Sequence, residues 1–84
     1  MPKPLRMTDH ARTVMVEREL AEQWIELAAR APQWEAPDPR PGVVRRFRVI
    51  PERGDRIIRV ACVETPDEIR ILSAFLDRRA RKPK

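Results

Sequence analysis

The chain has 84 residues, of which 42% are hydrophobic and 37% charged, and its formal net charge is +5. A chain of this length builds one small hydrophobic core, so we expect a single domain. The apolar residues are too numerous for a wholly disordered chain and too scattered for a membrane span, which excludes a membrane partner. No apolar stretch follows the first cations, as it would in a secretory signal, so we expect a cytoplasmic protein.

The residues that hold metals and cofactors are scarce. The single cysteine, Cys62, lies in an apolar run and is predicted to be a small core residue rather than a reactive thiol. One cysteine and one histidine make no metal-ligand cluster. Gly42 and Gly54 are the only glycines, which excludes a glycine-rich phosphate loop. We therefore expect neither a metal nor a cofactor.

Positive charge is concentrated in the second half of the chain. Residues 1–42 hold six basic and seven acidic side chains, whereas residues 43–84 hold twelve basic and six acidic ones. Fifteen of the eighteen cations are arginine, whose planar fork binds phosphate and stacks on bases. The composition fits a polyanionic partner and fits equally well a solvated basic face.

The first third of the chain predicts a tail and two helices. Residues 1–7 are predicted to be a flexible, extended tail. Thr8 can cap a first helix that runs to about Arg18. Apolar residues then recur at helical spacing from Leu20 to Ala31, which predicts a second amphipathic helix that Pro32 ends.

A proline-rich connection and two strands follow. Residues 32–42 contain four prolines and one glycine, with a short edge strand expected at residues 33–36. Trp34 in this connection is expected to pack against the sheet edge, and stacking on a base is the alternative. Residues 43–50 alternate as a strand, and Gly54 marks the turn that follows. Residues 56–64 are apolar on both faces, which predicts a central strand.

The segment Thr65–Lys82 fits two structures. As a helix it has a Thr-x-x-Glu start, Pro66 at the first helical position, and Ile69, Leu72 and Leu76 on one face. As a strand it has Thr-Pro-Asp-Glu as a reverse turn, followed by strict alternation from Ile69. The local pattern slightly favours the helix and leaves the strand open.

Short motifs along nearly the whole chain, from about residue 8 to residue 79, follow one known pattern in order. They are His10-Ala11-Arg12, Val16-Glu17-Arg18, Glu22-Gln23-Trp24-Ile25, Asp38-Pro39, Gly42-Val43, Arg46-Phe47, Gly54-Asp55-Arg56-Ile57-Ile58-Arg59-Val60 and Ile69-Arg70-Ile71-Leu72-Ser73-Ala74-Phe75. In this order and spacing the chain resembles the bacterial domain-of-unknown-function family 4258, which is similar to BrnT- and RelE-type toxins of toxin-antitoxin systems.

The resemblance implies an α+β fold of the barnase, EndoU, colicin and RelE ribonuclease group. Two N-terminal helices would pack on a three- to four-stranded antiparallel sheet in a single domain over residues 8–77. Residues 56–64 would pair as a hairpin with residues 68–75, so Thr65–Asp67 becomes the turn and residues 78–84 become a basic C-terminal extension. One departure is Glu19, which stands where family members usually have glycine, so we expect either a turn of different shape between the helices or two nearly continuous helices.

The resemblance also implies a metal-independent endoribonuclease, whose partners would be RNA and a cognate antitoxin protein. Such chemistry needs a base, a proton donor and cations around the phosphate. The candidate catalytic residues are His10, Arg46, Arg59 and Arg70. The candidate nucleic-acid-binding residues are Arg45, Arg48, Arg56, Arg78, Arg79, Arg81 and Lys82.

Each assignment has a plainer alternative. A lone histidine in the first turn of a helix is more often a surface or cap residue, and strand arginines are as often a solvated face as phosphate ligands. If these alternatives hold, the chain has the same fold but is a non-catalytic module that binds nucleic acid or protein. A homodimer formed through the second helix is a third hypothesis.

Overall fold

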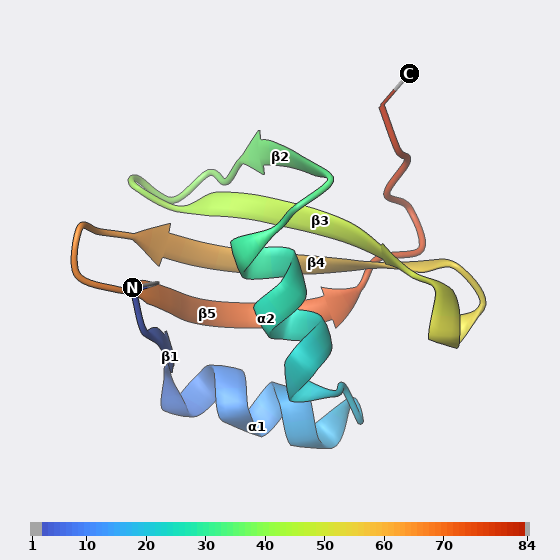
Figure 1. Ribbon diagram of the computed structural model, residues 1–84, viewed down its shortest axis with the longest axis horizontal. Helices are drawn as coiled ribbons and strands as arrows, with labels where there is room; N and C mark the ends of the chain where they lie inside the picture. The colour runs from blue at the N-terminus through green and yellow to red at the C-terminus, as the bar shows by residue number, and fades with distance from the viewer. Residues whose placement is uncertain (1–2, 84) are drawn as a thin grey trace.

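The computed structural model describes residues 3–83, which form two helices packed on a five-stranded mixed sheet (Figure 1). The elements in chain order are β1 (Leu5–Met7), α1 (Asp9–Glu17), α2 (Glu22–Arg30), β2 (Trp34–Pro37), β3 (Val44–Ile50), a 3-10 turn η1 (Pro51–Arg53), β4 (Arg56–Glu64) and β5 (Ile69–Leu76). The strands lie side by side in the order β1-β5-β4-β3-β2. The predicted α+β class is therefore confirmed. Neither helix in residues 3–83 is long and apolar enough to cross a bilayer.

The segment with two predicted structures is a strand. β5 pairs antiparallel with β4, as the hairpin prediction required. The turn forms because the Thr65 hydroxyl accepts hydrogen bonds from the backbone N–H groups of Asp67 and Glu68, both at 3.2 Å. The strand prevails over the helix because pairing with β4 satisfies its backbone and buries Ile69 and Ile71.

Residues Leu5–Met7 differ from the predicted tail, since β1 pairs in parallel with the first residues of β5. Met7 is buried, which anchors the strand in the core. The strands β2 to β5 form the expected antiparallel sheet, and the unexpected β1 makes it five-stranded and mixed. Residues 1–2 of the predicted tail lie outside the described residues.

The two helices begin at different kinds of cap. The Thr8 hydroxyl accepts a hydrogen bond from the Ala11 N–H at 3.1 Å, so α1 starts where the sequence predicted. α2 starts at Glu22 rather than Leu20, because Glu19 adopts a positive φ of 53° and turns the chain. This left-handed conformation is the one that glycine favours. The turn thus takes a glycine-like shape although glutamate occupies the position.

The core lies between the helices and one face of the sheet. α1 packs on β5, and α2 packs on β4 and β3 (Figure 1). The largest fully buried side chains are Ile25, Ile50, Ile58, Val60, Cys62 and Ile71. Burial raises the pKa of the Cys62 thiol, and the predicted core role of this cysteine is confirmed.

The residues after β5 have no regular secondary structure through Pro83. The Asp77 N–H donates to the Ile57 carbonyl at 2.8 Å, and the Asp77 carboxylate accepts from the N–H groups of Arg79 and Ala80. These bonds hold the start of the predicted basic extension against the sheet. Lys84, its last residue, lies outside the described residues.

Candidate nucleic-acid interface

Many arginines of this chain are neutralised by carboxylates. In residues 3–83, the arginines that make ion pairs are Arg6, Arg30, Arg40, Arg45, Arg46, Arg59 and Arg70. Four others share one location and make no ion pair with any described residue. The other described arginines without an ion pair, Arg12, Arg48, Arg79 and Arg81, lie outside this group of four.

These four arginines, Arg18, Arg53, Arg56 and Arg78, line one open cavity of about 530 Å³, here called the arginine pocket. Leu20, Phe75 and Leu76 complete its lining, and no carboxylate of residues 3–83 belongs to it. The pocket forms where η1, the start of β4 and the end of β5 meet at one end of the sheet (Figure 1). The end of α1 brings Arg18 to the same place.

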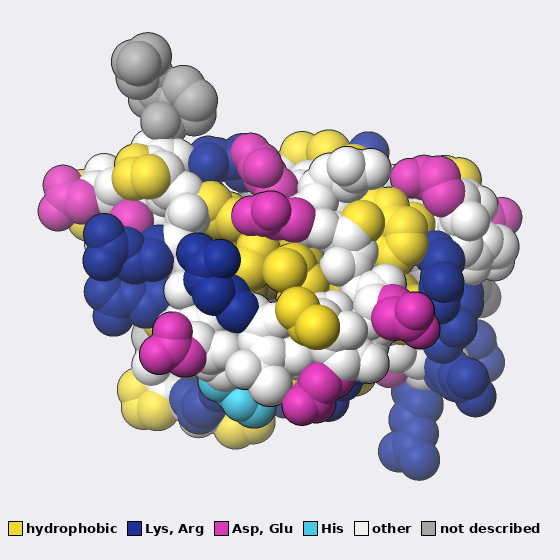
Figure 2. All heavy atoms as spheres, turned by 90° about the horizontal axis from the view of Figure 1, so that it is seen from below, with side chains coloured by type: hydrophobic (Ala, Val, Ile, Leu, Met, Phe, Trp, Pro, Cys, Tyr) yellow, Lys and Arg dark blue, Asp and Glu magenta, His cyan; other side chains and the backbone are white. Residues whose placement is uncertain are grey.

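A second cavity of about 400 Å³ shares Phe75, Leu76 and Arg78 with the first. Its other lining residues are Arg59, Asp77 and Arg79. We call the two cavities together the arginine groove. Its only carboxylate, Asp77, is already bound to Arg59 at 3.1 Å, so the groove carries a strong net positive charge. Figure 2 shows cationic side chains gathered at both ends of the molecule, on either side of a central hydrophobic band.

Phe75 lies at the junction of the two cavities and is held by two guanidinium groups. The Arg59 guanidinium carbon lies 4.1 Å from the ring centroid, and that of Arg18 lies 5.6 Å from it. Arg18 also donates a 3.0 Å hydrogen bond to the Ala74 carbonyl. This carbonyl belongs to the part of β5 that extends beyond its pairing with β1. The contact therefore fixes Arg18 at the rim of the pocket.

Burial lowers the pKa of Arg59, and the nearby Arg45 lowers it further. An arginine stays charged at any physiological pH, so the shift reports mainly the cost of burying a charged group, to which the nearby Arg45 adds. A phosphate in the groove would offset that cost.

The four candidate catalytic residues are not brought together by any contact in residues 3–83. His10 is exposed in the first turn of α1 and makes no hydrogen bond or ion pair with the three arginines. Arg70 is exposed at the start of β5 and pairs with Glu68 at 2.9 Å. Arg59 alone of the four lines the groove.

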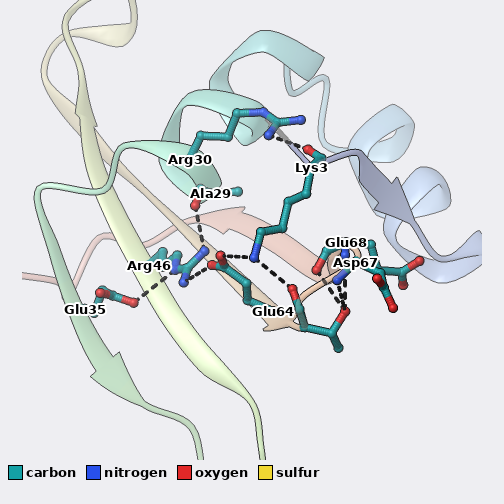
Figure 3. Close-up of polar contacts among 9 residues, drawn as sticks. Lys3, Ala29, Arg30, Glu35, Arg46, Glu64, Asp67 and Glu68 are labelled. Atoms are coloured by element: carbon teal, nitrogen blue, oxygen red, sulfur yellow. Dashed lines mark hydrogen bonds and ion pairs between the residues drawn. The ribbon is translucent and has the colours of Figure 1, made fainter. Parts of the chain in front are cut away.

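All three nitrogens of the Arg46 guanidinium group donate hydrogen bonds within the protein (Figure 3). Its guanidinium donates to the Ala29 carbonyl at 2.7 Å, to Glu35 at 3.0 Å and to Glu64 at 2.6 Å. Burial alone would lower the pKa of Arg46, but the two carboxylates outweigh it and the pKa is raised. The side chain joins the end of α2 to three strands, which is a structural position.

The candidate nucleic-acid-binding residues divide into three groups. Arg56, Arg78 and Arg79 line the groove. Arg45 is paired with Asp38 at 3.0 Å, and Arg48 donates to the Ala31 carbonyl at 2.6 Å. Arg81 and Lys82 are exposed in the segment after β5.

The sequence did not predict two of the groove residues, Arg18 and Arg53. Arg18 ends a helix and Arg53 lies in a turn, so no strand pattern marked them. No local signal could have found them, because acidic residues stand at pairing distances along the chain from both, Glu22 from Arg18 and Asp55 from Arg53. Among residues 3–83, no group of three His, Cys, Asp or Glu side chains could hold a metal ion.

The chain was compared with family models, curated proteins and solved structures, and nothing matched. The resemblance to the toxin-like family thus stays a prediction.

Proposed function

We propose that this protein binds RNA, and that the arginine groove holds the phosphates of the RNA backbone. The observation that carries the proposal is the convergence of four arginines on one cavity without a carboxylate partner in residues 3–83. Side chains of like charge repel one another, so such a cluster is stabilised by a bound polyanion. Arginine also suits this ligand, because its fork matches two phosphate oxygens.

RNA cleavage by a toxin-like enzyme is a separate proposal. The groove lining contains no histidine, and its one carboxylate is paired with Arg59. Cleavage would therefore need His10 or another base to reach the phosphate from outside the groove. RNA breakdown that a His10→Ala variant loses would support the toxin hypothesis and its antitoxin partner. Binding without breakdown would favour the non-catalytic alternative.

The binding proposal is tested by fluorescence anisotropy with a labelled single-stranded RNA of about 12 nucleotides at about 50 and 200 mM KCl. Four phosphate contacts on a single strand predict an affinity about 50-fold weaker at the higher salt. The R56Q/R78Q double variant should bind at least about 10-fold more weakly and show a shallower salt dependence.

The matched control is R40Q/R70Q, which removes the same charge at the other end of the sheet (Figure 1). Its affinity should change by no more than about 3-fold, since each arginine is exposed and engaged with its own carboxylate. Equal losses in both double variants would show general basicity rather than a site. No binding at the lower salt would refute the function.

A further inference from the structure

The face of the sheet opposite the helices carries a row of four side chains in register. Trp34 of β2 pairs with Phe47 of β3, Phe47 with Arg59 of β4, and Arg59 with Phe75 of β5. Because side chains alternate along a strand, directly paired residues point to the same face. We call these four side chains the aromatic row.

The aromatic row faces away from the helices. Arg46 and Arg48, which flank Phe47 on β3, donate to backbone carbonyls at the C-terminal end of α2. Ile58 and Val60, which flank Arg59 on β4, belong to the helix-covered core. In Figure 1, α2 crosses the near face of the sheet and no helix lies behind it.

The planar groups of the row lie against one another in two pairs. The Trp34 and Phe47 rings are stacked, with centroids 5.2 Å apart and an angle of 5° between their planes. The Arg59 guanidinium lies over the Phe75 ring. Phe47 is buried by these neighbours, while Trp34, Arg59 and Phe75 stay partly exposed. β2 is the last strand of the sheet, so no further strand covers the indole of Trp34.

The row continues the arginine groove, because Arg59 and Phe75 belong to both. Neighbouring strands lie about 4.8 Å apart, so the row spans about 14 Å across four strands. Its members already stack on one another, so an incoming base meets the row at its open end, on the Trp34 ring of the edge strand β2. Aromatic rings and guanidinium planes are the groups on which unstacked bases pack. The bases of a duplex are already stacked and would not reach such a surface.

We propose that the protein selects single-stranded RNA, with the backbone in the arginine groove and the bases stacked on the aromatic row. The inference rests on the proposed function, because the groove must hold the phosphates for the row to meet the bases. The occupant is a single strand rather than a protein, since the row leads directly into a groove whose charge complements phosphate.

The test compares three polyanions: single-stranded oligoadenylate of about 12 nucleotides, its duplex with oligouridylate, which carries about twice the charge, and inorganic polyphosphate of about the same charge as the single strand. We expect the single strand to bind at least about 10-fold more tightly than the other two. A Trp34→Ala variant should lose about 5- to 150-fold for the single strand and little for polyphosphate.

Intrinsic fluorescence gives a readout that does not depend on a destabilising substitution. In a Trp24→Phe variant, Trp34 is the only tryptophan, and oligoadenylate should quench its emission. The Trp34→Phe variant keeps only Trp24, whose ring lies 5.8 Å from the guanidinium carbon of the groove residue Arg53, so its emission reports on the phosphate site rather than on the row.

The outcomes separate the two proposals. Equal binding of all three probes with unchanged Trp34 emission would refute the stacking of bases on the aromatic row and leave the proposal of phosphate binding intact. Preference for the duplex would overturn it as well. No binding of any probe would refute the proposed function, and this inference with it.

Discussion

Arg46 donates a 2.6 Å hydrogen bond from Nη2 to the Glu64 carboxylate, and so ties β3 to the far end of β4. Lys3 binds the same carboxylate at 2.8 Å, and Arg30 donates to the Lys3 carbonyl at 2.7 Å (Figure 3). This network links the segment before β1, the end of α2 and the β4–β5 hairpin. An arginine that sequence reasoning assigned to catalysis is thereby a structural bridge.

Replacing Arg46 by alanine should lower the free energy of unfolding by about 2 kcal/mol, because two carboxylates and one carbonyl lose their donor. Urea unfolding followed by circular dichroism measures the change. Arg70→Ala is the control: its ion pair is exposed, so the free energy should change by no more than about 0.5 kcal/mol. An Arg46→Ala protein as stable as its parent but unable to cleave RNA would return Arg46 to the catalytic candidates.

A substitution at Met7 tests whether β1, which the sequence did not predict, pairs with β5. Met7 is buried in the core, so Met7→Ala should lower the free energy of unfolding by about 2–3 kcal/mol through lost burial and a cavity. The same urea measurement applies. Val16 is 72% exposed, so Val16→Ala should change the free energy by less than about 0.5 kcal/mol. Equal effects at the two positions would contradict the pairing of β1 with β5.

Glu19 is held at a positive φ of 53°, which costs a residue with a Cβ about 1 kcal/mol relative to glycine. Glu19→Gly should therefore raise the free energy of unfolding by up to about 1 kcal/mol, seen as a higher thermal midpoint. Glu26 lies inside α2, and Glu26→Gly should instead destabilise by about 1 kcal/mol. A Glu19→Gly protein that melts below its parent would show that this turn needs its glutamate.

Two carboxyl groups predict a loss of stability in acid. Hydrogen bonds from Arg40 hold the pKa of Asp38 well below its usual range, and Lys3 with Arg46 lowers the pKa of Glu64. A carboxyl whose pKa is depressed by folding stabilises the fold above its unfolded pKa of about 4. That stabilisation disappears as the pH falls from about 4 through the folded pKa.

Urea unfolding at a series of pH values should show a level stability from about pH 7 to 5 and a decline below about pH 4. Asp38→Asn should flatten the decline, because its share of the linkage is removed. Glu17→Gln serves as the control, since Glu17 is exposed and makes no ion pair in residues 3–83. A decline that is as steep in Asp38→Asn as in the parent would refute the assignment to Asp38.

Most elements could be predicted from the sequence because each depends on local chemistry. The Thr8 hydroxyl caps α1, Pro32 stops α2, and alternation marks β3 and β4. The segment from Thr65 remained open, since its apolar residues satisfy both a 3.6-residue and a 2-residue period. Only pairing with β4 decides between them, and pairing is not a local property.

The tertiary structure alone decided which arginines are free. Neighbours on one strand face opposite ways, so Arg46 lies among internal carboxylates while Arg45 and Phe47 lie on the other face. The register between β4 and β5 shifts between Ala61 and Cys62, so the alternation of faces is interrupted there. The amino-acid composition does not reveal this shift. Arg18, Arg56 and Arg78 are far apart in the chain. They meet only because the end of α1, the start of β4 and the end of β5 lie at the same end of the sheet. The sequence determined that the protein carries surplus arginine; the fold determined where that charge is left without a partner, because ion pairing depends on distances in space.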